Sequence, residues 1–347
     1  MDAFVDALCA EARIRKEEMG EPVKTIYFGG GTPSRLRRGH FDKIFDTLQQ
    51  HFAIEPTAEI TVEANPDDLS ESYVEMLSRL PVNRLSIGIQ SFNDEELKFL
   101  SRRHSAQEAI NAVKRCQQHG FENISIDLMY GLPEQTEEIW HYNLRQAIAL
   151  DVPHISSYHL IYEEKTRMYR LLQTGKIKPV EEEASTTLFA MLIDQLTSHG
   201  YLHYEISAFG KEGYFSRHNS AYWKNEKYLG LGPAAHSFDG NSRSLNIPSL
   251  IRYIKGMESG ILNRETEQLS IGEKYNEAVL TGLRTMWGID LAALATRFGE
   301  EFYLYCLQNS QKYIERNLLK TEGNRLKLTR DGIFISDGIM SDLMWID

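Results

Sequence analysis

Cysteine is scarce in this chain of 347 residues, and its spacing excludes two kinds of site. The three cysteines, Cys9, Cys116 and Cys306, are far apart and form no C-x-x-C pair. They therefore define neither a disulfide framework nor a cysteine-based metal site. We expect each of them to be a small buried hydrophobic residue.

Long apolar runs and an excess of positive charge are also lacking. No run approaches the roughly 20 residues that a membrane-spanning helix needs, and no signal peptide is visible at the start. The formal net charge is −11, so the composition gives no electrostatic support for binding to nucleic acid. These features predict a cytoplasmic protein with no nucleic-acid partner.

Strand-like and helix-like segments alternate regularly in the first half of the chain. Mostly apolar runs rich in Ile, Val, Leu and aromatic residues predict strands at 24–29, 59–64, 84–89, 123–130 and 154–161. Amphipathic segments between them predict helices, which favours a parallel α/β sheet with right-handed crossovers, open or closed into a barrel. Residues 2–19 predict a helix that ends at Gly20. Since no strand precedes it, we expect the repeat to lack its first strand.

The later part of the chain lacks this regular alternation and predicts two further regions. We expect a barrel over 1–210, an aromatic and glycine-rich connecting region over 211–264, and a small helical, winged-helix-like domain over 265–347. The segment HYEISAF predicts a sixth strand or edge segment. RLKLT and the residues after it predict a short β-ribbon and a closing helix.

Polar and glycine residues gather where the predicted strands end. In a parallel α/β fold these ends share one rim, where ligands bind. Open glycine backbone could accept an ammonium group, Glu63 supplies charge, Arg102 suits a carboxylate and Asp127 suits a ribose hydroxyl. Alone, each is typical of a turn, a helix cap or a surface charge, but their convergence predicts a site for an amino acid joined to a nucleoside. The rim residues are Gly30, Gly31, Thr32, Glu63, Gln90, Arg102, Asp127 and Tyr158.

Six motifs resemble one known family over nearly the whole chain. YFGGGTPS, ITVEANP, LSIGIQSF followed by Arg102, IDLMYGLPEQT, HNSAYW and LGLGPAAHSF occur in the order of the radical S-adenosylmethionine (SAM) family that contains oxygen-independent coproporphyrinogen III oxidase. The resemblance is closer to the HemW haem-chaperone branch. It implies a partial (β/α)6 barrel of the TIM-like type, and a SAM site at the rim residues with Arg102 at the cofactor's carboxylate.

The motif HNSAYW resembles the signature that the HemW branch associates with haem. It implies a haem site at His218, Asn219, Tyr222 and Trp223, with haem-acceptor proteins as partners, and it allows for peripheral contact with membrane-bound acceptors. From spacing alone the motif is structural, because His218 and Tyr222 are four residues apart and share one helix face.

One family feature is missing from the sequence. The family holds a [4Fe–4S] cluster with C-x3-C-x2-C before the first helix, and none of the three cysteines matches those positions. We therefore expect no metal site and no catalytic residues here. The family's first strand and cysteine loop would precede residue 1, so either the fold begins at residue 1 or the chain has lost its front. Three functions stay open: a HemW-like protein that binds and delivers haem, an oxygen-independent coproporphyrinogen III oxidase, and a clusterless module that binds haem or SAM.

Overall fold

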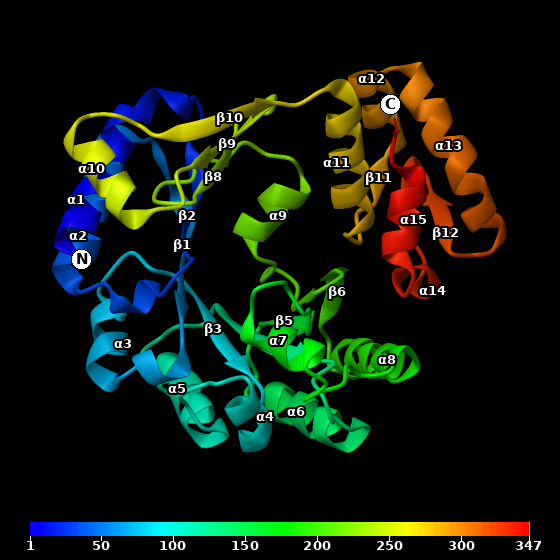
Figure 1. Cartoon of the computed structure of the whole chain (residues 1–347), viewed down its shortest axis with the longest axis horizontal. Helices are drawn as coiled ribbons and strands as arrows, with labels where there is room; N and C mark the ends of the chain where they lie inside the picture. The colour runs from blue at the N-terminus through cyan, green and yellow to red at the C-terminus, as the bar shows by residue number, and fades with distance from the viewer. Residues whose placement is uncertain (347) are drawn as a thin grey trace. The chain divides into compact units, whose positions relative to one another are not determined.

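Five hydrophobic runs of the sequence become neighbouring strands of one sheet. In a computed structural model, which describes residues 1–346, this sheet has the order β1-β2-β3-β4-β5-β7-β6 (Figure 1). The strands β2 to β5 are parallel, whereas β7 pairs antiparallel with β5 and with β6. The strands are β1 Val23–Phe28, β2 Ile54–Ala64, β3 Arg84–Gln90, β4 Ile124–Tyr130, β5 His154–His159, β6 Leu202–Glu205 and β7 Ala208–Gly210.

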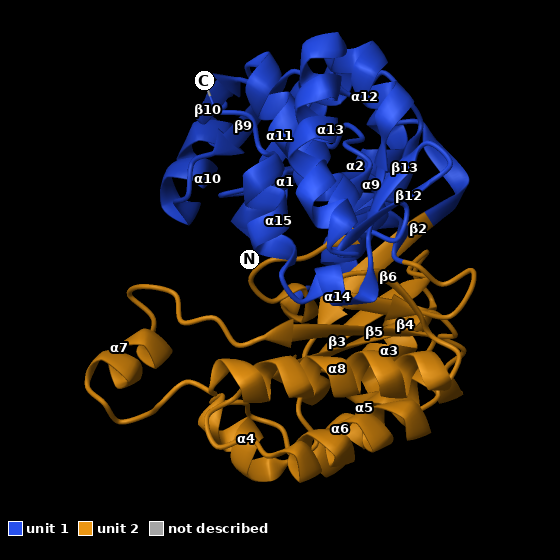
Figure 2. Cartoon of the chain, turned by 90° about the vertical axis from the view of Figure 1, so that its right-hand side faces the viewer, with its two compact units in different colours: residues 1–26, 36–58, 216–347 blue, residues 27–35, 59–215 orange. Residues whose placement is uncertain are grey.

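Two compact units divide the chain (Figure 2). The barrel unit contains residues 27–35 and 59–215, and the terminal unit contains 1–26, 36–58 and the residues from 216 onwards. The strands β1 and β2 begin in the terminal unit and end in the barrel unit.

Most helices of the barrel unit cover one face of its sheet, whereas α7 lies apart from it (Figure 2). Trp140 on α6 is fully buried, and its indole Nε1 donates to the carbonyl of Leu188 on α8 at 2.9 Å, which joins two of these helices. Thr136 caps α6 by accepting from the backbone N–H of Ile139. The helices are α3 Glu71–Ser78, α4 Asp94–Phe99, α5 Ala106–Gln118, α6 Glu137–Ala149, α7 Arg167–Gln173 and α8 Glu182–Ser198, with short 3-10 turns at Pro33–Arg35 and Pro66–Asp68.

The terminal unit combines the first helices with the last third of the chain. Its sheet β10-β9-β8 is antiparallel, and a second small sheet has the order β11-β13-β12. Tyr275 of α11 is fully buried and donates its hydroxyl to the carbonyl of Leu343, so α11 is tied to the closing helix α15.

The elements of the terminal unit have these bounds: α1 Asp2–Ile14, η1 Lys16–Glu18, α2 Arg38–His51, α9 Arg217–Trp223, β8 His236–Phe238, β9 Ser242–Asn246, α10 Leu250–Glu258, β10 Arg264–Gln268, α11 Ile271–Leu283, β11 Ile289–Asp290, α12 Leu291–Phe298, α13 Glu300–Glu315, β12 Leu319–Glu322, β13 Arg325–Leu328, α14 Arg330–Ile333 and α15 Ser336–Leu343.

The fold confirms the predicted class and corrects three details. The sheet is a curled half-barrel with a helical C-terminal region that contains the expected β-ribbon. HYEISAF forms two short antiparallel strands, because the chain turns between Glu205 and Ala208. The first helix ends at Ile14 and only a 3-10 turn continues it. The sheet β8–β10 was not predicted. The boundaries after residues 210 and 264 remain predictions.

Membrane-spanning helices are not found in residues 1–346: none of their helices is both long enough and apolar enough to cross a bilayer.

Candidate functional site

The glycine segment after β1 is closely packed at Gly29 and open at Gly30 and Gly31. A Cβ on Gly29 would lie 2.5 Å from the ring of Tyr27 and 2.9 Å from Glu63 Oε1, so a side chain there would displace Tyr27 or Glu63. Gly30 and Gly31 have φ values of +72° and +62°, and within the described chain a Cβ on either would meet nothing within 4 Å. This is the backbone that a ligand can approach closely.

Glu63, at the end of β2, fastens this glycine segment. Its Oε2 accepts the backbone N–H of Gly30 at 3.1 Å, and its Oε1 accepts the hydroxyl of Tyr27 at 2.7 Å. Burial and the Glu63 charge raise the pKa of Tyr27, which therefore stays a neutral donor. The carboxylate thus sets the shape of the loop as well as supplying negative charge beside it.

Arg102 lies where β3 ends, with part of its guanidinium unused. Its Nη2 donates to Asn65 Oδ1 and to the carbonyl of Gly88, both at 2.7 Å. Among residues 1–346 these are its hydrogen bonds, so Nη1 and Nε remain able to bind a carboxylate. Gln90 adopts an unusual φ of +72°, and a Cβ on Gly88 would lie only 3.0 Å from its Nε2. The structure therefore brings Gln90 and Arg102 together around Gly88.

Asp127 on β4 has an environment that shifts its protonation. Burial is the largest cause, and the Glu63 charge adds to it, so the pKa of Asp127 rises to about 6. Arg84 and hydrogen bonds from Ser156 and Ser86 oppose this rise. The Glu63 charge thus acts on the protonation of Asp127.

Two rim residues lie at exposed positions. The side chain of Tyr158, near the end of β5, is 44% exposed. Thr32 is also exposed, and its carbonyl accepts the N–H of Arg35 in the turn after the glycines. Both are accessible to a ligand, and their binding roles remain predictions.

These rim residues fit the cofactor that the resemblance implies. Open glycine backbone, a carboxylate beside it and two unused guanidinium donors match the ammonium and carboxylate of an amino acid. Asp127 adds an acceptor that a ribose hydroxyl could bind.

In the terminal unit, the motif HNSAYW forms the short helix α9. Ser216 caps it by accepting the N–H of Asn219. His218 Nδ1 lies 2.9 Å from Thr25 Oγ1, and His218 Nε2 lies 3.1 Å from the hydroxyl of Tyr222. Both imidazole nitrogens are therefore engaged, and a ligand could reach Nε2 only if Tyr222 moved away.

The aromatic residues around α9 form two separate sets of contacts. The rings of His218 and Tyr222 meet edge to face at 5.0 Å, and Tyr222 meets Tyr228 in the same way at 4.6 Å. Trp223 makes a different contact, with the guanidinium of Arg284 5.1 Å from its ring centre. The structure thus gathers His218 with Tyr222 and places Trp223 against another partner.

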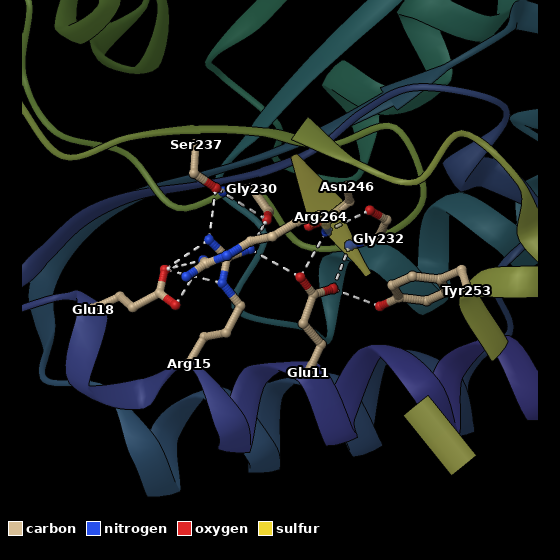
Figure 3. Close-up of polar contacts among 9 residues, drawn as sticks. All are labelled: Glu11, Arg15, Glu18, Gly230, Gly232, Ser237, Asn246, Tyr253 and Arg264. Carbon is tan, nitrogen blue, oxygen red and sulfur yellow. Dashed lines mark hydrogen bonds and ion pairs between the residues drawn. The ribbon is translucent and has the colours of Figure 1, made fainter. Parts of the chain in front are cut away.

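The segment LGLGPAAHSF is held by two charged residues that the sequence analysis missed (Figure 3). Arg15 Nη1 donates to the carbonyl of Gly230 at 2.8 Å, and Glu11 Oε2 accepts the N–H of Gly232 at 2.8 Å. Glu11 and Arg15 are almost fully buried and form an ion pair at 2.9 Å. The only signal in the sequence was their spacing of four residues on the first helix.

Further polar groups complete this network (Figure 3). Tyr253 and Asn246 donate to Glu11, whereas Ser237 accepts from Arg15. Glu18 accepts from both Arg15 and Arg264. The two buried charges are thus extensively hydrogen-bonded, as buried charges must be.

Two of the three cysteines lie in surroundings that disfavour an iron–sulfur ligand. All are buried, as predicted, and burial raises the pKa of Cys116 to about 12 and that of Cys306 to about 11. Cluster ligands are thiolates, which such burial disfavours. Within residues 1–346 no three His, Cys, Asp or Glu side chains are grouped to hold a metal ion.

Known proteins place this architecture in one superfamily. The family model of the radical SAM superfamily matches residues 5–145, and that of the HemN C-terminal domain matches residues 269–335. A solved structure of coproporphyrinogen III oxidase (HemN) from Escherichia coli superimposes with a TM-score of 0.84 at 22% identity, over 99% of this chain and 83% of that one. The half-barrel is therefore that of a radical SAM protein.

Two curated relatives narrow the assignment. The heme chaperone HemW of Bacillus subtilis is 33% identical over 98% of this chain and 90% of its own length. The heme chaperone HemW of Lactococcus lactis is 32% identical over 100% of this chain and 90% of its own length. The chain belongs to the HemW family.

Proposed function

We propose that this protein binds haem and delivers it to acceptor proteins. The observation that carries the proposal is α9, where the imidazole of His218 lies beside two tyrosine rings in a chain whose relatives are called heme chaperones. Imidazole is a common haem ligand, and aromatic rings suit a flat macrocycle. The acceptors include membrane-bound proteins reached peripherally, and the location is cytoplasmic.

His218 would bind iron through Nε2 while Nδ1 keeps its contact with Thr25. A hydrogen bond at the second ring nitrogen orients a metal-binding histidine and fixes its tautomer. The hydroxyl of Tyr222 lies within hydrogen-bond distance of Nε2, so it would act as a latch that must move away before iron can bind there. Asn219 and Trp223 complete the proposed haem-binding motif.

The rim of the barrel unit is proposed to hold SAM. Gly30, Gly31 and Thr32 would receive its amino group beside Glu63, and Arg102 would bind its carboxylate. Gln90, Asp127 and Tyr158 would contact the remainder of the cofactor. With a reduced cluster, this cofactor supplies radical chemistry.

We propose further that the 347-residue chain is catalytically inert, since its own cysteines offer no C-x3-C-x2-C motif. The alternative function is oxidation of coproporphyrinogen III, because the solved structure of coproporphyrinogen III oxidase (HemN) has the same fold. Restoring the C-x3-C-x2-C segment to the chain, followed by anaerobic cluster reconstitution and a coproporphyrinogen decarboxylation assay, separates the two. We expect no vinyl product, and measurable product would favour the oxidase.

Haem titration followed by absorbance tests the main proposal. We expect one haem per chain. In His218→Ala the haem affinity should fall at least about tenfold, which corresponds to about 1.4 kcal/mol of binding free energy. His199→Ala is the matched control, because that histidine is exposed on the barrel unit. Transfer is measured by adding a haem-free globin as a general acceptor. If His218→Ala binds haem as tightly as the wild type, His218 is not the iron ligand. If the wild type shows no stoichiometric haem binding, the proposal is rejected.

A further inference from the structure

A chain of hydrogen bonds in the barrel unit links two parts of the rim that follow different strands. At one end, Ser34 in the turn after the glycine segment donates its hydroxyl to Asp68 Oδ2 at 2.7 Å. Asn65 Nδ2 donates to the same oxygen at 3.2 Å, and Asn65 Oδ1 accepts from Arg102 Nη2 at 2.7 Å. The carboxylate of Asp68 therefore connects the glycine segment to the guanidinium of Arg102.

The side chain of Asn65 is held in one orientation because its two amide atoms meet opposite charges. Its oxygen accepts from the cation Arg102 and its N–H group donates to the anion Asp68, so a rotated amide would lose both contacts. Asn65 follows β2 directly, and its carbonyl accepts the backbone N–H of Asp68 at 3.0 Å in the next turn. Asp68 thus fixes the amide against which Arg102 is placed.

The middle of this hydrogen-bond chain is shielded from water. The side chain of Asp68 is only 12% exposed, and Ser34 is 7% exposed. Hydrogen bonds to a charged group are stronger where water competes less, so loss of this carboxylate would be felt at both ends. The neighbouring Asp67 provides a contrast, because it pairs with Arg103 at 2.6 Å. Among residues 1–346, Asp67 has no hydrogen bond to Ser34 or Asn65.

We propose that Asp68 is a positioning residue for the amino-acid part of SAM, and that it acts through Asn65 and Arg102 without touching the ligand. The inference rests on the proposed SAM site and adds a residue that the rim does not include. Arg102 would bind the ligand's carboxylate with Nη1 and Nε, while Nη2 stays on Asn65. Glycine backbone at the other end of the chain would meet the ammonium group, so one protein carboxylate couples both halves of this site.

Two probes separate the orientation of Arg102 from general damage to the site: SAM, and decarboxylated SAM, which keeps the amine but has no carboxylate. We expect the wild type to bind SAM at least about tenfold more tightly than decarboxylated SAM. In Asp68→Ala this affinity ratio should fall to about threefold or less, because Arg102 loses its fixed orientation. Damage that is merely structural would weaken the binding of both probes equally and leave the ratio unchanged.

Two conservative variants show whether hydrogen bonding or charge is responsible. Asp68→Asn keeps an oxygen that can accept from both Ser34 and Asn65, so the affinity ratio should stay within about twofold of the wild type. Asp67→Asn is the matched control, since it removes a neighbouring carboxylate outside the chain, and the same result is expected. If either variant lowers the ratio as much as Asp68→Ala does, negative charge is responsible and the inference is wrong.

Asn65→Ala tests the same link from its other side and keeps the inference testable if Asp68→Ala does not fold. It should lower the affinity ratio as much as Asp68→Ala does. Combining the two substitutions should lower the ratio little further, because both break one hydrogen-bond chain. Two effects that multiply in full would contradict the chain. Circular dichroism and urea unfolding establish whether each variant is folded.

The wild type alone tests the proposed SAM site on which the inference rests. If it binds neither probe, the SAM site is rejected and the inference falls with it. If it binds both probes equally, the contact between Arg102 and the ligand's carboxylate is wrong. If it prefers SAM, and Asp68→Ala and Asn65→Ala prefer SAM to the same degree, the SAM site stands and the inference alone is overturned.

Discussion

The rim of the barrel unit and the α9 cluster of the terminal unit are assembled in opposite ways. The rim takes one or two residues from each of several strand ends, so the sheet brings distant segments such as Gly30 and Glu63 together. The α9 cluster takes His218 and Tyr222 from one helix, four residues apart. The rim therefore depends on the arrangement of β1 to β5, whereas the cluster combines local helical geometry with one distant contact, from Thr25 to His218.

The two regions also differ in how ready they are to bind. At the rim, Arg102 has unused donors and two glycines are open. On α9, both nitrogens of His218 are already engaged. A ligand at the rim adds to existing contacts, whereas iron at His218 must replace one. The predictions below test this contrast, in order of decreasing expected effect.

The largest effect should come from the buried network that supports the terminal unit. Arg15→Ala leaves Glu11 buried without its cationic partner, which should cost about 3–5 kcal/mol in the free energy of unfolding. Arg38→Ala is the matched control, because Arg38 and Asp42 have the same i,i+4 spacing but are exposed, where such pairs contribute only about 0.3–0.5 kcal/mol. Urea unfolding measures both. Similar losses would contradict the assigned role of burial.

A smaller loss is expected at the rim. Arg102→Lys keeps the positive charge but removes the two-pronged guanidinium, so SAM affinity should fall roughly 10- to 100-fold. Equilibrium dialysis with labelled SAM gives the value. Arg103→Lys serves as the control, since Arg103 is exposed and pairs with Asp67. The assigned carboxylate contact is wrong if Arg102→Lys binds SAM like the wild type.

Asp127 predicts a pH dependence of SAM binding. With a pKa of about 6, the carboxyl is charged at pH 7.5 and mostly protonated at pH 5, so a ligand that needs the carboxylate should bind about tenfold more weakly at pH 5. Asp127→Asn should remove this dependence. A wild-type affinity that is flat between these pH values would show that the carboxylate is not used.

Stability should respond to the same group with a definite sign. Because the pKa is about 6 in the folded state and about 3.9 when unfolded, the folded protein binds more protons between these values. The contribution of Asp127 to the free energy of unfolding therefore falls as pH rises from about 4 to about 6. Urea unfolding of Asp127→Asn and of the wild type across this pH range isolates the contribution of Asp127 to the free energy of unfolding.

The smallest effect concerns the latch on α9. Tyr222→Phe removes the hydroxyl at His218 Nε2, a hydrogen bond that contributes about 0.5–1.5 kcal/mol, so haem should bind about 2- to 10-fold more tightly. Tyr228→Phe is the control, because Tyr228 contacts Tyr222 by its ring. Weaker haem binding by Tyr222→Phe would mean that the tyrosine assists binding instead of opposing it.

Much of the barrel could be predicted because its strands are continuous apolar runs. All five predicted strands were found, with ends differing by up to a few residues. The sheet β8–β10 could not, since a strand such as Arg264–Gln268 is entirely polar and exposed and lacks the alternation that marks a half-buried strand.

The candidate sites show the same division. Strand ends predicted where the rim residues lie, because parallel strands deliver their termini to one edge, and the binding roles of these residues remain predictions. Glu11 and Arg15 were missed, since charged residues on a helix are normally assigned to solvent. Only contacts with Gly230 and Gly232, far along the chain, explain their burial.

The bond from Arg15 to Gly230 has a consequence for synthesis of the chain. The two residues are 215 positions apart in the sequence. At translation rates of about 5–20 residues per second, the first helix waits roughly 10–40 s after it is made before its partner is translated. During that interval Glu11 and Arg15 stay hydrated, and the terminal unit cannot close on the ribosome until most of the protein has emerged.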